Sequence, residues 1–508
     1  MAEKKARDRR AAAPGPARRL AAILLAGTVL AALPALAQQR TTAETQTFQQ
    51  PLDPLVRATE ITPADATADA ATTASAAETD TQTTATTGPA ITDAQADALD
   101  DAADLNERAR RVARGERLNL REGSVDGARS DFGDPYEPLG IRVGSFILRP
   151  SITQGLRHER TKSGGTTNRT FSQTGFRGVL TSDWSRHQLT IDAEGIYQRN
   201  ISGRGETEPQ ARIGSDLRLD LSDDTIANLT AGYQFEREDS TDPNAIDGAS
   251  AQSGVHNFTA GARIERDFGL IRGTIDAELE REIYGSAKLS GGRKLSLSDR
   301  NFTEGTLTGR VGYELSPALI PYLEASIGRA LYDKTRDSLG YERSNSTLGG
   351  RAGVEIDLGE KLRGDLGIGY TRASFDDRRL KAIDALALDG TVTWSPQRGT
   401  ELRLGLSTEI EPSTTAGQSG YVNYATTAEL THELRENLIA RLTGAYTWRD
   451  FPSSGSTDQD IYLVGTGLTW DLNRWLALTG DVSYELTRQS GAADTGITRA
   501  GIGLVLRR

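Results

Sequence analysis

The feature that most constrains this chain of 508 residues is a two-residue alternation of apolar and polar side chains that begins near residue 141. The stretch RWLALTGDVSYELTR, Arg474 to Arg488, shows it clearly. One face carries Leu476, Leu478, Gly480, Val482, Tyr484 and Leu486, and the other carries Ala477, Thr479, Asp481, Ser483, Glu485 and Thr487. A period of two predicts an extended β-strand. It leaves open whether the apolar face meets a protein core or lipid.

Segments of this kind recur about eighteen times up to residue 507, and the connections between them decide the architecture. Short connections such as Ser185-Arg186 and Asn473 alternate with longer ones such as HERTKSGGTTNR, residues 158–169. This is a hairpin repeat with all tight turns at one end. An even strand number, one end of short turns and apolar-out, polar-in alternation are typical of bacterial outer-membrane barrels. We therefore predict an all-β, transmembrane antiparallel β-barrel over residues 141–508, with about 18 strands and 16 as the alternative.

The positions of large aromatic residues give a partly independent test of this fold. Aromatic side chains of membrane barrels collect at the two membrane interfaces, whereas those of soluble β-sandwiches lie mid-strand in the core. Most tryptophans here lie near expected short turns, and Trp448 and Tyr484 lie toward long loops. A parallel β-helix or tandem β-sandwiches explain this distribution less well. The residues expected at an interface girdle are Trp184, Trp394, Trp448, Trp470, Trp475 and Tyr484.

The residues before the alternating region differ in composition. Residues 1–37 have a basic leader, an apolar stretch and the small-residue site Ala35-Leu36-Ala37, which predicts a cleaved signal peptide. Residues 38–92 form a Thr/Ala-rich tail that we expect to be disordered. Residues 93–114 form a possible helix, a plug or a periplasmic segment, and residues 115–140 are a linker into the barrel.

Charged residues of both signs fall on the expected inward faces of the strands. Buried charges require water or partners. The candidates to line the lumen are Arg263, Glu265, Arg272, Asp276, Glu278, Arg310, Arg351, Glu355, Arg403, Asp481 and Glu485. An eighteen-stranded interior is too wide for side chains alone to fill, which favours a water-filled channel over a self-neutralising ionic wall. We expect no outside loop long enough to fold inward and narrow the bore. The channel is then either wide or narrowed by another segment, and our hypothesis is that the 93–114 helix plugs or gates it from the periplasm.

Signals for catalysis, metal binding and nucleic-acid binding are missing from the sequence. The chain has no Cys, and its four His residues are not at metal-ligand spacing. We therefore expect no catalytic residues, no metal and no cofactor. A rim hydrolase built on His158 with Glu159, or on His256 with Asp247, would need converging groups. The net charge of −11 argues against a nucleic-acid partner.

The segment YEPLGIRVGSFILRPSI, Tyr136 to Ile152, resembles the first strand of the putative beta-barrel porin families of Gram-negative outer membranes. The resemblance implies a porin-like channel for passive diffusion of small hydrophilic solutes or ions. The alternative is a structural or export-assembly barrel without general pore activity, for instance a duct for envelope polysaccharide. We expect export to the outer membrane by the cleaved signal peptide. The expected partners are outer-membrane lipid and the barrel-assembly machinery, with a periplasmic protein bound through residues 38–130 as a further candidate.

Overall fold

The computed structural model describes residues 136–508 except 204, 416 and 453–456. The predicted signal peptide (1–37), tail (38–92) and helix (93–114), and all but the last residues of the 115–140 linker, lie outside the described residues. In the part of the chain that is described, no helix is long and apolar enough to cross a membrane.

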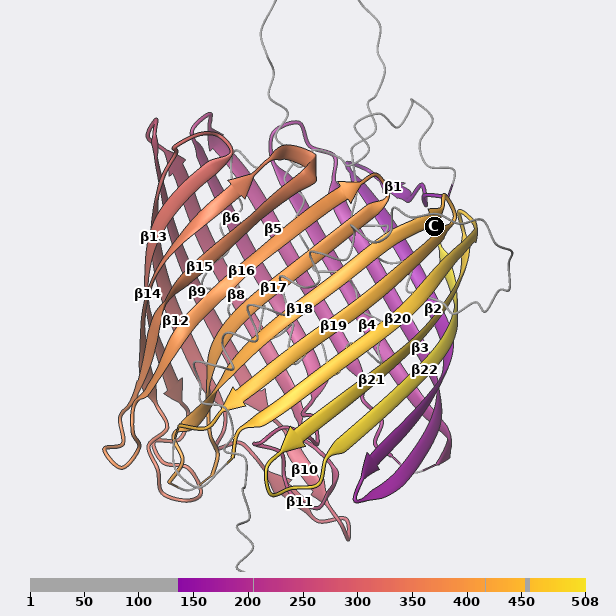
Figure 1. Ribbon diagram of the computed structural model, residues 1–508, viewed down its shortest axis with the longest axis vertical. Helices are drawn as coiled ribbons and strands as arrows, with labels where there is room; N and C mark the ends of the chain where they lie inside the picture. The colour runs from indigo at the N-terminus through magenta and orange to yellow at the C-terminus, as the bar shows by residue number, and fades with distance from the viewer. Residues whose placement is uncertain (1–135, 204, 416, 453–456) are drawn as a thin grey trace, which may run out of the picture. The chain divides into compact units, whose positions relative to one another are not determined.

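Eighteen antiparallel strands form a closed ring (Figure 1). They are β2 (Phe146–Ser163), β3 (Gly165–Ser182), β4 (Gln188–Gly203), β5 (Gln210–Ser222), β6 (Thr225–Arg237), β8 (Gly254–Asp267), β9 (Ile271–Tyr284), β12 (Phe302–Tyr313), β13 (Leu319–Tyr332), β14 (Asn345–Asp357), β15 (Leu362–Phe375), β16 (Ile383–Gln397), β17 (Thr400–Pro412), β18 (Gly420–Arg435), β19 (Leu438–Asp450), β20 (Gln459–Asn473), β21 (Leu476–Gln489) and β22 (Thr495–Arg507). The pairing of β2 with β22, from Ser151↔Arg507 to Ser163↔Thr495, closes the ring. The predicted eighteen-stranded antiparallel barrel is confirmed.

The remaining described elements are short. Strand β1 (Ile141–Val143) pairs with the start of β2. Strands β7 (Ala249–Ala251), β10 (Ser286–Leu289) and β11 (Lys294–Ser296) form a separate small sheet from two of the long loops. A 3-10 turn, η3 (Gly359–Lys361), connects β14 to β15.

The barrel has polar and charged side chains on its inner face and apolar side chains on its outer face, the reverse of a soluble protein. On β21, every second residue from Ala477 to Thr487 is buried, including Asp481 and Glu485, while the alternate residues other than Gly480 are more exposed. The same holds on β9, where Ile275 and Leu279 are exposed and Arg272 is buried. Apolar side chains gain nothing from facing water, so an exposed apolar band around a closed sheet identifies a lipid-facing surface.

The turns separate by length between the two ends of the barrel, as predicted. Short turns share one end with the C-terminus, at the top of Figure 1, and the long loops with β10 and β11 lie at the other. One expected loop is not a loop: residues 158–169 continue β2 and β3, which meet at a tight turn around Gly164 with φ +64°. Their backbone hydrogen bonds to neighbouring strands extend the two strands although their side chains are polar.

A charge added to the outer face of β21 should harm the barrel more than one added to its inner face. Val482 lies on the outward face, while Ser483 points inward and is paired with Arg499 on β22. We expect Val482→Asp to cost about 1–2 kcal/mol, because a carboxylate must then enter the lipid-facing band. Ser483→Asp should cost less, because its carboxylate lies opposite the guanidinium-bearing Arg499, although Arg499 also pairs with Glu485 and Glu159. Urea titration of the refolded barrel in lipid vesicles measures both, and equal losses would contradict the assigned faces.

Candidate functional site

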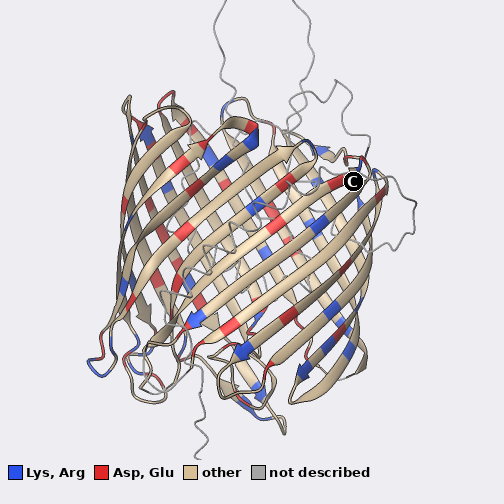
Figure 2. Cartoon of the chain, in the orientation of Figure 1, with Lys and Arg blue, Asp and Glu red and all other residues tan. Residues whose placement is uncertain are grey.

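Charged residues of both signs lie along the strands of the barrel and not only in its loops (Figure 2). The eleven candidate lumen residues all occupy the inward register. Arg263, Glu265, Arg272, Arg310, Glu355, Asp481 and Glu485 are buried, and Asp276, Glu278, Arg351 and Arg403 are half-buried. The structure brings most of them into ion pairs, which the sequence pattern could not specify.

The largest group of ion pairs centres on Arg310 of β12. Its guanidinium donates hydrogen bonds to Glu324 of β13 (2.8 Å), Glu355 of β14 (3.0 Å) and Asp365 of β15 (3.0 Å), and the residue is 5% exposed. One cation therefore bridges four adjacent strands. Charge-assisted hydrogen bonds are stronger than neutral ones, so this network fixes the relative positions of these strands.

Two further arginines extend this group around the wall. Arg351 pairs with Glu324 at 2.6 Å and with Asp389 at 3.4 Å. Arg272 pairs with Asp267 at 2.7 Å and lies 3.9 Å from Glu355. The resulting network runs from β8 to β16, mostly at the short-turn end, and contains more carboxylates than guanidinium groups.

Tyr322 completes this network, and two glycines make room for it. Its hydroxyl donates to Asp365 at 2.8 Å, and the Arg310 guanidinium lies 3.8 Å from the centre of its ring. A Cβ on Gly353 would lie 2.4 Å from the Tyr322 ring, and one on Gly367 would lie 2.9 Å from its hydroxyl. The small residues thus let an aromatic ring lie flat against the inner wall.

A second group of ion pairs lies beside the seam between β2 and β22. Arg157 of β2 donates to Asp481 of β21 at 3.0 Å. Arg499 of β22 pairs with Glu485 at 3.0 Å and with Glu159 at 3.3 Å. These contacts tie the closing strands together from the inside.

The long loops do fold inward, contrary to the sequence-based expectation. Residues 238–253, between β6 and β8, reach the connection between β17 and β18. The Asn244 side chain donates to the Pro412 carbonyl (3.1 Å) and accepts from the Thr414 N–H (2.9 Å). Their strands lie seven pairings apart in one direction around the ring and nine in the other, so the loop spans the lumen. We call residues 238–253 the crossbar.

The crossbar is held by charged side chains as well as by Asn244. Arg300, between β11 and β12, donates to Glu238 at 2.7 Å, to the Asn244 carbonyl at 2.8 Å and to Thr414 Oγ1 at 3.3 Å. On the opposite wall, Arg449 lies 3.7 Å from Asp242. The first half of the crossbar, residues 238–244, is therefore anchored at Glu238, Asp242 and Asn244.

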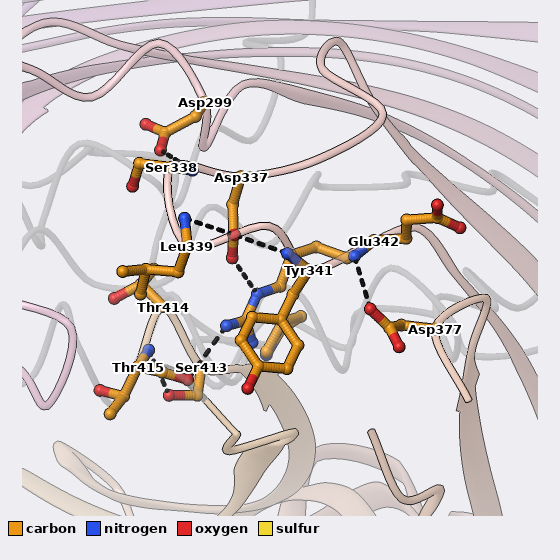
Figure 3. Close-up of polar contacts among 12 residues, drawn as sticks. Asp299, Asp337, Ser338, Leu339, Tyr341, Glu342, Asp377, Ser413, Thr414 and Thr415 are labelled. Carbon is orange, nitrogen blue, oxygen red and sulfur yellow. Dashed lines mark hydrogen bonds and ion pairs between the residues drawn. The ribbon is translucent and has the colours of Figure 1, made fainter. Parts of the chain in front are cut away.

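A third loop converges on the same attachment point (Figure 3). Arg343, before β14, donates to the carbonyls of Thr415 (3.0 Å) and Gln418 (2.8 Å). Asp337 positions it by accepting from Arg343 Nε at 2.8 Å and from the N–H groups of Leu339 and Tyr341, each at 2.9 Å. Hydrogen bonding to these donors holds the pKa of Asp337 below its ordinary value despite partial burial.

Asn244, Arg300 and Arg343 were absent from the residues selected on sequence. Their partners lie up to 170 residues away in the chain, and the loops have no periodicity that reveals them. The only local signal is the turn-forming stretch Asp242-Pro243-Asn244, which predicts a tight turn and nothing about its contacts.

A polar cavity of about 1120 Å³ lies around the crossbar at the long-loop end. Among the described residues that line it are twelve carboxylate and six guanidinium side chains. The acidic excess is therefore concentrated at the mouth. Low-dielectric walls focus the field of such charges. The described residues contain no cluster of His, Cys, Asp and Glu suited to a metal ion.

The crossbar contains a carboxyl group that titrates near neutral pH. Burial raises the pKa of Glu238 from 4.5 to about 7, with Asp242 and Glu282 adding to the rise and Arg300 opposing it. If the crossbar is released, Glu238 becomes hydrated and regains its ordinary pKa. Glu238 therefore binds its proton more tightly when the crossbar is attached than when it is released. Attachment of the crossbar is therefore most stable below about pH 4.5 and weakens as the pH rises through about 7.

This dependence should be visible in single-channel recordings. At constant salt, we expect fluctuations between current levels to become more frequent from pH 5 to pH 8. Glu238→Gln keeps an acceptor for Arg300 but has no charge to bury, so its recordings should be quiet at both values. Unchanged fluctuation in the wild-type protein across this range would contradict the role of Glu238.

The expected interface aromatics do not all lie on the exposed surface. Trp184, Trp475 and Tyr484 are exposed, and Trp394 and Trp470 are half-buried. Trp448 departs from the expectation: it is 1% exposed and stacks on Tyr424 of the neighbouring strand, with ring centres 5.0 Å apart. The cross-strand partner covers its ring, so Trp448 is not available to a membrane interface.

The histidines considered for a rim hydrolase have ordinary partners. His158 contacts Thr170 Oγ1 on the outer face at 2.9 Å, whereas Glu159 points inward to Arg169. His256 contacts the Tyr233 hydroxyl at 3.1 Å. These contacts bring neither histidine next to a carboxylate partner.

Comparison with known proteins places this barrel in a family. A family model described as "Putative beta-barrel porin 2" matches residues 134–508. The chain belongs to this family. The match covers the whole barrel, agrees with the resemblance in residues 136–152, and identifies a β-barrel of the porin type in the outer membrane. Membership points to a channel and not to an enzyme.

Solved structures give more distant likenesses to this porin-family barrel. OpdK from Pseudomonas aeruginosa is 10% identical, covering 71% of this chain and 99% of that chain, with a TM-score of 0.36. OccAB4 from Acinetobacter baumannii is 11% identical, covering 71% and 98%, with a TM-score of 0.35. Likenesses at this level carry no argument about the solute. No curated protein gives a significant match to the chain.

Proposed function

We propose that this barrel is a passive channel for small hydrophilic solutes or ions, narrowed at its outer mouth by the crossbar. The observation that supports this proposal most directly is the charged cavity of about 1120 Å³ inside a closed ring whose outer face is apolar. In a barrel of this diameter, the charged side chains on the inner wall cannot fill the lumen. They require water in the lumen as well as partners on neighbouring strands.

We further propose that the channel prefers cations. Carboxylates outnumber guanidinium groups two to one among the described residues lining the mouth, where a permeating ion meets them first. Asp239 and Asp247, both in the crossbar, have no ion pair with the described residues. Their charges therefore act on the solution in the mouth.

A planar lipid bilayer with a KCl gradient tests both proposals. We expect a conducting channel whose reversal potential indicates a modest preference for potassium, about two- to fivefold over chloride. Asp239→Asn with Asp247→Asn should reduce this preference. The control, Asp376→Asn, removes a carboxylate that pairs with Arg329 on the outer face and should leave it unchanged. An anion-selective current would refute the cation preference.

A refolded barrel that conducts nothing would refute the channel itself. That result would favour the structural or export-assembly barrel, whose support is the length of residues 38–130, enough to reach a periplasmic partner. Heat-dependent mobility on a gel confirms that the protein under test is folded. The absence of a current is then not caused by misfolding.

A further inference from the structure

The outer face of β2, which carries Ile152, Gln154 and Leu156, becomes basic beyond Leu156. Ile152 and Leu156 are exposed on this face and belong to the lipid-facing band. The next residues of the same face toward the long-loop end are His158, Arg160 and Lys162, all exposed. A strand that continues without a break through this change marks where the hydrocarbon ends and the headgroup layer begins.

The same boundary carries arginines elsewhere on the barrel, and there each has a carboxylate partner. Arg281 of β9 pairs with Asp333 at 2.5 Å, Arg329 of β13 with Asp376 at 2.6 Å, and Arg372 of β15 with Asp384 at 3.1 Å. All six side chains lie at least partly at the surface, next to the long loops. These sectors of the barrel are therefore close to neutral.

Arg160 and Lys162 on β2, and Arg199 on β4, differ from these arginines. All three are exposed, and none has an ion pair with the described residues. Arg199 lies in register with Ser172, which is in register with Leu156, and on the outer face of β4 it lies between the exposed Tyr197 and Ile201. The adjacent carboxylate, Glu159, points into the barrel and pairs with Arg169 and Arg499. We call these three residues the outer basic patch.

The charge of the patch contrasts with the rest of the molecule. The chain has a net charge of −11 and an acidic mouth, yet the outward face of β2–β4 at the headgroup level carries unpaired cations. Cations held just above a hydrocarbon band attract anionic headgroups, and guanidinium groups bind phosphate oxygens strongly. The long-loop end faces the outer leaflet, which in this membrane is made of phosphorylated glycolipid.

We propose that Arg160, Lys162 and Arg199 bind the phosphate groups of a phosphorylated outer-leaflet glycolipid, which anchors this side of the barrel. This binding is independent of whether the channel conducts, because the patch lies on the outer face.

Binding of purified glycolipid to the full-length protein in detergent tests the proposal. The probes are the phosphorylated glycolipid, its enzymatically dephosphorylated form and inorganic phosphate. The variant Arg160→Gln, Lys162→Gln, Arg199→Gln should weaken binding of the phosphorylated form roughly tenfold or more. The dephosphorylated form should bind the wild-type protein as weakly as the phosphorylated form binds the variant.

The matched control removes the same number of cations from the paired sites: Arg281→Gln, Arg329→Gln, Arg372→Gln. It should keep the wild-type affinity, and both variants should retain heat-dependent gel mobility. Equal weakening by the two variants would overturn the proposal, because it would show a general charge effect. Displacement of the glycolipid by equimolar inorganic phosphate would also overturn it, because the site would then be a simple anion site.

Discussion

Asn244→Ala with Arg300→Ala should give a channel with a higher conductance than the wild-type protein. The two side chains make the hydrogen bonds that fasten the crossbar to residues 412–414 on the far side of the lumen. Charged hydrogen bonds contribute about 1.5–3 kcal/mol each and neutral ones about 1, so losing several should release the loop. An eighteen-stranded bore without an internal obstruction conducts as a wide pore, and a roughly twofold or larger rise in single-channel conductance is expected.

The reverse experiment holds the crossbar in place. The chain has no Cys, so Asn244→Cys with Thr414→Cys creates a unique thiol pair at the attachment point. A short bifunctional thiol reagent should then suppress the current fluctuations without raising the conductance. Arg336→Ala, which breaks an exposed ion pair with Glu342 in another loop, should leave the conductance unchanged. The same conductance in the wild-type protein and the double alanine variant would show that the crossbar does not limit the current.

Arg310→Met should destabilise the barrel by about 3–5 kcal/mol, because it leaves buried carboxylates without their shared cation. Asp365 is the most affected, since Glu324 retains Arg351 and Glu355 retains Arg272 nearby. Urea titration of the barrel in lipid vesicles measures the free energy of unfolding. Adding Asp365→Asn and Glu355→Gln to Arg310→Met should recover a large part of the loss, since the uncompensated charges are then removed.

Arg329→Met is the matched control for this prediction. Arg329 pairs with Asp376 at 2.6 Å, closer than any contact of Arg310, but both side chains are about 40% exposed. Exposed ion pairs contribute at most about 1 kcal/mol, so the control should unfold at nearly the wild-type urea concentration. An equal loss of unfolding free energy in Arg310→Met and Arg329→Met would mean that burial does not determine how much these ion pairs stabilise the barrel.

The sequence was sufficient for the ring and for the two faces of each strand, because both depend on a local period. Asp481 and Glu485 could be assigned to the inner face from the alternation of β21 alone. The same alternation could not distinguish strand from loop at residues 158–169, where both faces are polar and only pairing with β22 and within the hairpin extends the strands.

The crossbar could not be predicted for a different reason. Its length is ordinary for a loop between two strands, and nothing in its residues indicates a partner on the opposite wall. Arg300 and Asn244 meet Thr414 only after the strands between them have closed into a ring. The same is true of Arg310, whose partners Glu324 and Asp365 are determined by which strands lie side by side in the closed ring. Such contacts are properties of the assembled barrel and cannot be predicted from a single segment.

The seam between β2 and β22 has a consequence for how the barrel can be made. The strands that close the ring are the first and the last of the eighteen, about 350 residues apart along the chain. Until β22 forms, the free edge of β2 and the free edge of the most recently formed strand carry unpaired backbone N–H and C=O groups. Lipid offers these groups no hydrogen-bond partners. A chain truncated within the barrel therefore leaves two strand edges unpaired in lipid unless another protein pairs with them.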